Sequence, residues 1–312
     1  MFDPTEDKLD RDFDESMRMF EKAMVPIAEP IEPKQPARVL IAIDGSSQDA
    51  AIIEAATTLQ KRFDATLLVL DARETDDEEA ASPSIDSLLA IANSERLAKS
   101  SGTSYDQILA AIESRQPDLV VLPCPFGRDF QSIGAESIGT VVDVILSRSP
   151  VPLLIIRSTD QPLATACKQV AMVVSSECDA EPLAAGWALG LSSESASISL
   201  EVVMDREQLE NLQAILEVLV PERTLEPEQL NTALAESHSR LHVAMQKAAQ
   251  EAGLSYRLVP KATQTAPPLA GQEAVPQLIV LAYEIDDHFV HGFIMDRIRR
   301  SPHPVLVAST HQ

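Results

Sequence analysis

The chain is poor in the residues on which several classes of protein depend. It has three cysteines in 312 residues, Cys124, Cys167 and Cys178, which are too few and too irregularly spaced for a disulfide framework or a zinc site. A reducing compartment is therefore the simplest expectation. Aromatic residues make up only 4% of the chain, which disfavours recognition of nucleic-acid bases by stacking. No apolar run approaches the roughly 18 residues that a membrane-spanning helix needs.

Positive charge is also scarce. Lys and Arg total 25 against 48 Asp and Glu, which gives a formal net charge of −23. Nucleic acids and anionic membranes are bound largely through clusters of Lys and Arg, so neither is expected as a partner. The first residues are acidic, where a secretory signal would be basic and then apolar. We therefore expect a cytoplasmic protein.

What the chain does contain is a large aliphatic fraction. Hydrophobic residues make up 45% of it, and its 312 residues make two domains the first expectation. Short apolar runs alternate with amphipathic segments, a pattern that predicts parallel strands joined by helices. In the first half the expected strands are Arg38–Ile43, Ala65–Asp71, Asp118–Leu122 and Val151–Ile156.

Helices are expected between these strands. The first has Ser46 or Ser47 available as its N-cap residue and carries Ala50, Ile53 and Ala56 on one side. Further helical segments are expected at 85–97, 105–114 and 138–147. Each separates two expected strands, so the sequence predicts an α/β fold with helices on the faces of a parallel sheet.

Residues 1–36 are expected to form an acidic N-terminal helix and a Pro-rich linker. Phe13, Met17, Phe20 and Met24 lie on one face of the helix, and four prolines follow between 26 and 36. Such an apolar face must be buried, either on the protein's own surface or against a protein partner. The sequence leaves both possibilities open.

Several stretches of the first half recur in the second. Pro117–Leu122 recurs as Pro276–Leu281, and Arg148–Leu154 recurs as Arg300–Leu306. Lys168–Val174 is the counterpart of the first strand, and 200–205 echoes the second. The chain is therefore predicted to hold two copies of one α/β unit, the second with a helical insertion at 208–253 and a Pro-containing stretch at 261–275.

The first unit resembles the universal stress protein family. The resemblance rests on Arg38–Ser46, Pro117–Leu122, Gly139-Thr140 and Ser149–Ile156. It covers residues 37–157 closely and 168–309 loosely, so the chain resembles a tandem member with a degenerate second copy. The resemblance implies two open, five-stranded parallel sheets of the HUP or Rossmann-like class, with helices on both faces and a nucleotide crevice at the carboxyl ends of the strands. It also implies pairing through the last strands, as an intramolecular pseudo-dimer or a homo-oligomer.

The domains expected on this basis are consecutive. They are the N-terminal helix and linker (1–36), the first universal-stress-like domain (37–158), a linker (159–167) and the degenerate second domain (168–312).

The resemblance also implies a nucleotide site in the first unit. Nucleotide-binding members carry an Asp after the first strand, then Gly-x-x-Gly, nine residues, and Gly-Ser or Gly-Thr after the fourth. The candidate residues here are Asp44, Gly45, Ser46, Gly139 and Thr140, with Gly127 and Arg128 as a shifted phosphate loop, and ATP with Mg²⁺ as the candidate ligand. Pro123 and Phe126 stand where the two glycines belong, and a proline has no N–H to offer, so this site is expected to be degenerate.

The alternative for Asp44 and Ser46 is that they cap a turn and a helix. In the second copy Ser175 replaces the Asp, and Glu284, Asp286 and Asp287 would repel a triphosphate, so no nucleotide is expected there.

The histidines and cysteines offer weaker candidates for chemistry. His238 and His242 are one helical turn apart, and His288 and His291 flank an acidic loop, so either pair could ligate a metal ion; a solvated surface is the favoured interpretation of both, and no metal site is assigned. Cys124 lies near Arg128, which could lower the pKa of the thiol.

No motif of a hydrolase, a P-loop enzyme or a dinucleotide-binding enzyme occurs, so catalysis is not expected. The expected function is a stress-response regulatory module. Two alternatives stay open: an ATP-binding sensor or slow ATPase, and a ligand-free adaptor that binds proteins.

Overall fold

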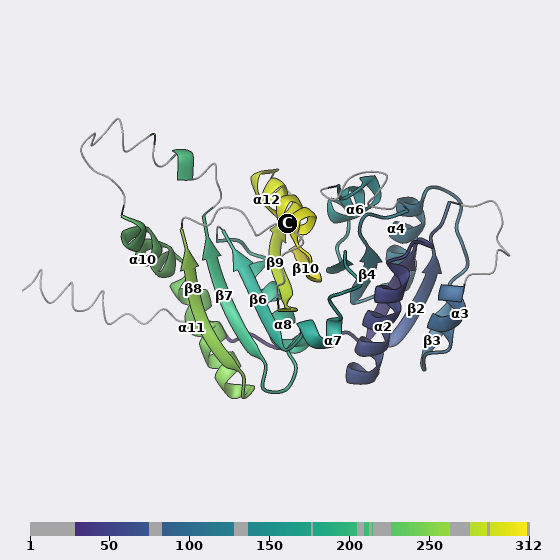
Figure 1. Cartoon of the computed structure of the whole chain (residues 1–312), viewed down its shortest axis with the longest axis horizontal. Coiled ribbons are helices and arrows are strands. Elements are labelled where there is room, and N and C mark those ends of the chain that lie inside the picture. The colour runs from purple at the N-terminus through teal and green to yellow at the C-terminus, as the bar shows by residue number, and fades with distance from the viewer. Residues whose placement is uncertain are drawn as a thin grey trace, which may run out of the picture.

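The computed structural model describes residues 29–74, 83–127, 137–175, 177–204, 209–211, 214, 226–262, 275–285 and 288–310. Ten of its strands form one sheet in the order β3-β2-β1-β4-β5-β10-β9-β6-β7-β8 (Figure 1). The strands are β1 (Arg38–Ile43), β2 (Thr66–Asp71), β3 (Ser94–Arg96), β4 (Leu119–Pro123), β5 (Leu153–Ile156), β6 (Gln169–Val174), β7 (Ser197–Val203), β8 (Ser255–Lys261), β9 (Leu278–Glu284) and β10 (Val305–Thr310).

Helices connect the strands and cover both faces of the sheet. They are α2 (Asp49–Phe63), α3 (Pro83–Leu89), α4 (Ser104–Arg115), α6 (Thr140–Leu146), α7 (Leu163–Ala166), α8 (Glu181–Leu191), α10 (Pro227–Ser237), α11 (Ser239–Glu251) and α12 (His288–Arg300).

The sheet consists of two five-stranded parallel halves. β3-β2-β1-β4-β5 are parallel to one another, as are β10-β9-β6-β7-β8. The last strand of each half, β5 and β10, pair antiparallel, with Leu154 opposite Leu306. This confirms the α/β fold expected from the sequence and places the joint between the two halves at their last strands.

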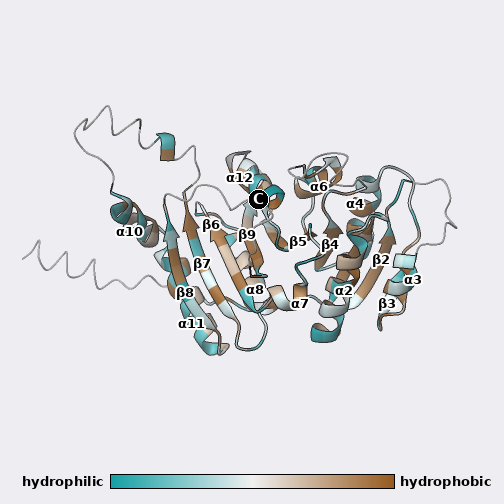
Figure 2. Cartoon of the chain, viewed as in Figure 1, coloured by the Kyte–Doolittle hydropathy of each residue, from teal (hydrophilic) through white to brown (hydrophobic). Residues whose placement is uncertain are grey.

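Strand composition explains why the sheet is covered on both sides. β1 reads RVLIAI, and all its residues after Arg38 are buried. Strands that are apolar on both faces need helices on both faces. In Figure 2 much of the inner strands β4, β6 and β9 is brown, whereas α11 carries teal residues.

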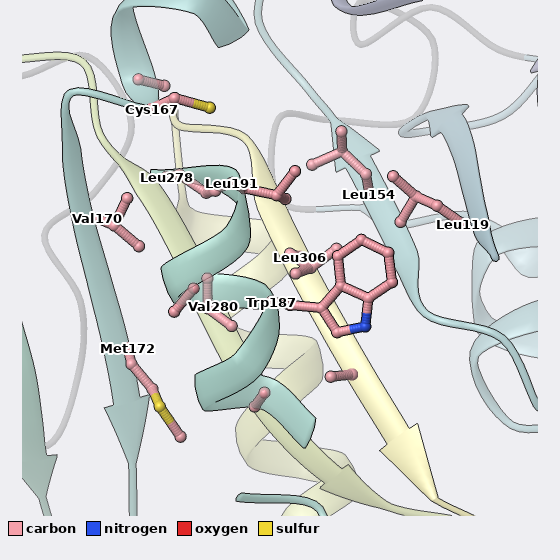
Figure 3. Close-up of a cluster of buried hydrophobic side chains, with 14 of the residues drawn as sticks. Leu119, Leu154, Cys167, Val170, Met172, Trp187, Leu191, Leu278, Val280 and Leu306 are labelled. Atoms are coloured by element: carbon pink, nitrogen blue, oxygen red, sulfur yellow. The ribbon is translucent and has the colours of Figure 1, made fainter. Parts of the chain in front are cut away.

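Two hydrophobic cores result, one on each face, and each runs through both halves. One core contains side chains of α2, α3, α7, α8, α10 and α11. The other contains side chains of α4, α6 and α12. Figure 3 shows Trp187 of α8 beside Leu306 of β10 and Leu154 of β5, directly over the joint. Because one aromatic side chain packs on strands of both halves, the two halves share a core.

The two closing turns are built alike. The Ser149 hydroxyl donates to the carbonyl of Val151 (2.8 Å) and accepts from the N–H of Val151 (3.1 Å). The Ser301 hydroxyl makes the same pair of bonds with His303, at 3.2 and 3.0 Å. The Arg-Ser-Pro-x-Pro segment that recurs in the sequence therefore makes the same turn before β5 and before β10.

One sequence prediction about the connections was wrong, and one strand was not predicted. The helix expected over 85–97 ends at Leu89, and β3 follows it as the outermost strand, because Leu67 on β2 offers an edge for Ser94 to pair with. The strand that was not predicted is β8, which ends where the expected Pro-containing stretch at 261–275 begins. β8 is only partly buried, as an edge strand is, so it lacks the apolar run that marks the inner strands.

The start of α2 also differs from the prediction. Its N-cap is Gln48 rather than Ser46 or Ser47, and it has no side-chain cap hydrogen bond. The Ser46 hydroxyl instead accepts the N–H of Gln48 (3.3 Å) within the preceding turn.

The residues before β1 run across the second half of the molecule. The N–H of Lys34 donates to the carbonyl of Gly186 in α8 (2.8 Å). A Cβ at Gly186 would lie 2.7 Å from the carbonyl oxygen of Glu32, and one at Gly190 would lie 1.7 Å from that of Lys34. The two glycines thus allow the segment 32–34 to lie directly against α8. The predicted N-terminal helix falls outside the described residues.

Candidate functional site

The candidate site lies at the carboxyl ends of β1 and β4. These parallel strands are neighbours in the sheet although β2 and β3 lie between them in the chain, so the strand order reverses here. Ligands of doubly wound sheets bind in the crevice at such a reversal. Asp44 follows β1, and the loop 124–127 follows β4.

Asp44 joins these two loops. Its Oδ1 accepts a hydrogen bond from the N–H of Ser46 (2.8 Å), and its Oδ2 accepts one from the N–H of Gly127 (2.6 Å). The first bond closes an Asx turn after β1. The second crosses from β1 to the loop after β4. The structure therefore brings Asp44, Ser46 and Gly127 into one hydrogen-bonded group.

Gly45 allows a basic side chain to approach the turn. Its φ of +77° is a conformation that favours glycine, and a Cβ there would lie 2.8 Å from Cδ of Arg73. The Arg73 guanidinium pairs with Asp71 at the end of β2 (Nη2 to Oδ2, 2.6 Å). Burial would raise the pKa of Asp71, but the hydrogen bonds and charge of Arg73 outweigh it and hold that pKa below its ordinary value. Arg73 was not among the residues predicted from the sequence.

Gln48 ties the start of α2 to the loop after β4. The residue is buried, and its Nε2 donates to the carbonyls of Cys124 (2.8 Å) and Arg157 (3.2 Å). One side chain thereby links β1, β4 and β5 at their carboxyl ends. A glutamine in a Ser-rich turn carried no signal that could have identified this role from sequence.

Arg157 makes a second link behind the same loop. Its Nη1 lies 3.2 Å from Sγ of Cys124 and donates to the carbonyl of Ser137 (3.1 Å). Burial raises the pKa of the Cys124 thiol to about 11, although the charge of Arg157 acts in the opposite direction. The lowered thiol pKa considered from the sequence is therefore wrong, because the cysteine is buried rather than placed beside solvent.

Asp49 adds a second carboxyl group beneath Asp44. It is buried, and burial, together with the negative charge of Asp44, raises its pKa to about 6, while a hydrogen bond from Ser84 acts against this. Burial therefore favours the protonated form of Asp49 more than it does for an exposed aspartate. Sequence analysis assigned no role to Asp49.

Gly139 and Thr140 lie on the far side of the loop. Gly139 is the N-cap of α6 with φ +81°, and a Cβ there would lie 3.5 Å from Cβ of Pro125. Thr140 begins α6 and is exposed. The glycine therefore packs against the loop that follows β4. Arg128 lies outside the described residues.

This geometry limits what the site can bind as it stands. The N–H groups of Ser46 and Gly127 both point at the Asp44 carboxylate, so an anion could use them only if Asp44 released them. Pro123 and Pro125 contribute no N–H to the loop between them. The Asp44 carboxylate thus already accepts two N–H groups at this edge of the sheet.

His238 and His242 have different partners in the fold. His238 stands between α10 and α11 and is 3% exposed, so the solvated position expected for it is wrong; it packs against Glu181 of α8. His242 instead contacts the hydroxyl of Tyr256 (2.9 Å). Within the described residues, no three His, Cys, Asp or Glu side chains are grouped as a metal ion would require. The acidic loop at 286–287 falls outside them.

Comparison with known proteins identifies the fold. No family model matches the chain, and no curated protein matches it. Among solved structures, a universal stress protein from Archaeoglobus fulgidus DSM 4304 is similar, with 15% identity, a TM-score of 0.54, and coverage of 88% of this chain and 96% of that one.

Two structures from Pseudomonas aeruginosa are similar as well. One, from strain UCBPP-PA14, is provisionally named a universal stress protein and has 14% identity and a TM-score of 0.56; the other, from PAO1, is described as functionally unknown and has 13% identity and a TM-score of 0.56. Each match covers 88% of this chain and 93% of the other. At these identities the likeness establishes a shared fold. Across the described ranges, no helix combines the length and apolarity needed to cross a membrane.

Proposed function

We propose that the protein is a cytoplasmic regulatory module of the universal-stress type, formed by two tandem units of which the second is degenerate. The observation that carries the proposal is the bond between Asp44 Oδ2 and the N–H of Gly127 at the reversal of strand order. The similarity to universal stress proteins over 88% of the chain supports the same assignment. The pairing of β5 with β10 supports a pseudo-dimer within one chain.

The first unit is proposed to retain a degenerate site for ATP with Mg²⁺. Asp44, Gly45, Ser46, Gly127, Arg128, Gly139 and Thr140 are its candidate residues. A nucleotide would have to replace the Asp44 carboxylate as the acceptor for the Gly127 N–H, so binding would move the loop after β4 relative to β1. Such a movement is what a nucleotide sensor, or a slow ATPase, requires.

A ligand-free adaptor is the second candidate. The same bonds favour it, because the Asp44 carboxylate already satisfies two N–H groups of the crevice. Its protein partner would bind the apolar face predicted at Phe13–Met24. In that case Asp44 holds two loops together and contributes only to stability.

Calorimetric titration of the nucleotide-stripped full chain with Mg-ATP separates these candidates. Asp44→Ala is the test variant, and Glu113→Ala, an exposed carboxylate of α4, is the matched control. Saturable binding near one equivalent supports the sensor, and its affinity should change in Asp44→Ala, which frees the N–H groups of Ser46 and Gly127, but not in the control. Absence of heat at millimolar Mg-ATP supports the adaptor. Release of phosphate that depends on Asp44 would contradict a purely regulatory role.

A further inference from the structure

Asp49 is a buried carboxyl group next to the bond that joins the two loops of the candidate site. It is the first residue of α2, and only 3% of it is exposed. Its Oδ1 accepts the backbone N–H of Asp44 at a long 3.5 Å, and the carboxylate of Asp44 accepts the N–H of Gly127. One residue, Asp44, thus connects Asp49 to the loop after β4.

The second oxygen of Asp49 is not satisfied. Oδ2 is buried and has no hydrogen-bond partner within the described part of the chain. A buried carboxylate needs hydrogen-bond donors to offset the loss of its hydration, so the charged form of Asp49 is costly in this position. The surroundings therefore favour the neutral acid.

The groups that act on Asp49 come from the loop after β1 and from α3. The negative charge of Asp44 opposes ionisation, whereas the backbone N–H groups of Asp44 and Gly45 favour it. The Ser84 hydroxyl of α3 favours it as well. Burial has the largest effect and, with the charge of Asp44, raises the pKa of Asp49 to about 6. Asp49 therefore changes its charge within the range in which histidine usually does.

Other charged side chains at this edge of the sheet do not titrate there. Arg73 pairs with Asp71 after β2, and Arg157 lies beside Cys124 after β5. A guanidinium stays protonated at these pH values, and the pKa of Asp71 is held below its ordinary value. Histidine does not occur in the sequence before residue 238.

The second half has a carboxyl group at the matching position. Glu181 is the first residue of α8, as Asp49 is of α2, and each helix follows the first strand of its half. Glu181 is also buried, and burial raises its pKa to about 8. Ser175, however, replaces Asp44 after the strand. The connection from a buried carboxyl group through an aspartate to a second loop is thus a property of the first half.

Protonation of Asp49 bears directly on Asp44, because two neighbouring carboxylates repel each other. While Asp49 is neutral, this repulsion is absent and Asp44 keeps its bonds to Ser46 and Gly127. When Asp49 gives its proton to solvent, its new charge destabilises the Asp44 carboxylate in this position.

We propose that Asp49 is a proton-controlled switch of the Asp44–Gly127 bond, with the neutral form holding the loop after β4 and the ionised form releasing it. The switch deepens the proposed function, because the bond occupies an N–H group of the candidate nucleotide site. It rests on that function only for its effect on nucleotide affinity.

The test follows the Gly127 amide resonance between about pH 4 and 8 in the full chain labelled with ¹⁵N-glycine. The chain has 10 glycines, so the spectrum is simple. The expected result is a shift with its midpoint near pH 6, in the direction of a weaker hydrogen bond as pH rises. Asp49→Asn should abolish it. Ser84→Ala keeps the switch but removes a bond that favours ionisation, so the midpoint should move to higher pH.

Two variants are controls for titration elsewhere. Glu181→Gln removes the matching carboxyl group of the second half, and His291→Gln removes a histidine that contacts Asp143 of the first half. Both should keep the Gly127 transition. The proposal is overturned if the parent shows no transition, if the transition persists in Asp49→Asn, if the midpoint does not rise in Ser84→Ala, or if either control loses the transition.

Titration with Mg-ATP at about pH 5.5 and 7.5 separates the switch from the proposed function. If both are correct, the affinity rises with pH more in the parent than in Asp49→Asn, because the ionised form frees the Gly127 N–H. No binding at either pH would contradict the nucleotide sensor, and the Gly127 transition, which needs no nucleotide, would still decide the switch. Binding with the same pH dependence in parent and variant would overturn the switch.

Discussion

His291 of α12 places its Nε2 3.2 Å from Oδ1 of Asp143 in α6, so a side chain of the second half meets one of the first. The other ring nitrogen of His291, Nδ1, lies 2.8 Å from the hydroxyl of Tyr283, which is buried in β9. A neutral imidazole can accept at one nitrogen and donate at the other, so one ring can serve both contacts. The contact between α6 and α12 therefore connects the two halves on the face of the sheet that these helices cover.

We expect substitutions of His291 and Asp143 to lower the free energy of unfolding by different amounts. His291→Ala removes a partner of the buried Tyr283 hydroxyl and should lower the free energy of unfolding by about 1–3 kcal/mol. Asp143→Asn should cost about 1 kcal/mol or less, because its side chain is 48% exposed. Urea unfolding followed by circular dichroism measures both. Equal losses in the two variants would contradict this assignment.

Arg62 of α2 connects the same halves on the other face. Its guanidinium donates to the carbonyls of Leu191 (2.9 Å) and Ser192 (2.8 Å) at the end of α8. Arg62→Ala should lower the free energy of unfolding by about 1.5–3 kcal/mol, because two hydrogen bonds from a charged group to a helix end are lost. Lys61→Ala, an exposed neighbour, should change it by about 0.5 kcal/mol or less. A similar loss in both variants would show that net charge, not these bonds, is responsible.

Gly190 is expected to control the position of the segment before β1. Gly190→Ala would place a Cβ 1.7 Å from the Lys34 carbonyl oxygen, so the segment must leave α8. Limited digestion with trypsin should then cleave after Lys34 faster than in the parent chain. Gly292→Ala is the control: it is also helical, but no atom lies within 4 Å of its Cβ position, so it should be neutral or stabilising by up to about 1 kcal/mol. Unchanged cleavage in Gly190→Ala would show that the segment tolerates displacement.

The raised pKa of Glu181 predicts that the free energy of unfolding depends on pH. Its pKa is raised from an ordinary 4.5 to about 8, so between these values the folded protein binds a proton that the unfolded chain has released. The stability contributed by this proton is fully present below about pH 4.5 and is lost as pH rises through about 8. Glu181→Gln should flatten the fall of the unfolding free energy over that window and should make the protein more stable than the parent at pH 9.

Denaturant titrations at several pH values check this prediction. Glu113→Gln should retain the slope of the parent, since its carboxyl is exposed. A slope that persists in Glu181→Gln would assign the titration to another group.

The fold was largely predictable because each inner strand can be recognised from the residues of that strand alone. Buried parallel strands are nearly continuous apolar runs, and β1, β4, β6 and β9 were all recognised from them. The edge strands β3 and β8 were not, since they are short or only partly buried and their sequences carry no such run. Their pairing depends on the edge that β2 and β7 offer.

The candidate site was predictable only in part. The position of Asp44 after an apolar strand marked it, and the structure joins it to Gly127. The roles of Gln48 and Arg157 depend on carbonyls and a thiol more than 30 residues away in the chain. His238 looked like a residue of a solvated helix, but the packing of the α10–α11 junction on α8 buries it.

The sequence by itself determined the class of fold, the two series of strands, and the Ser-Pro turns that precede β5 and β10, because apolar periodicity and turn chemistry act between near neighbours. Tertiary structure alone decided that Trp187 covers the joint, that Asp44 holds the N–H groups of its own crevice, and that His238 packs against Glu181. These depend on which distant side chains the assembled sheet and its helices bring together, and on how deeply those side chains are then buried.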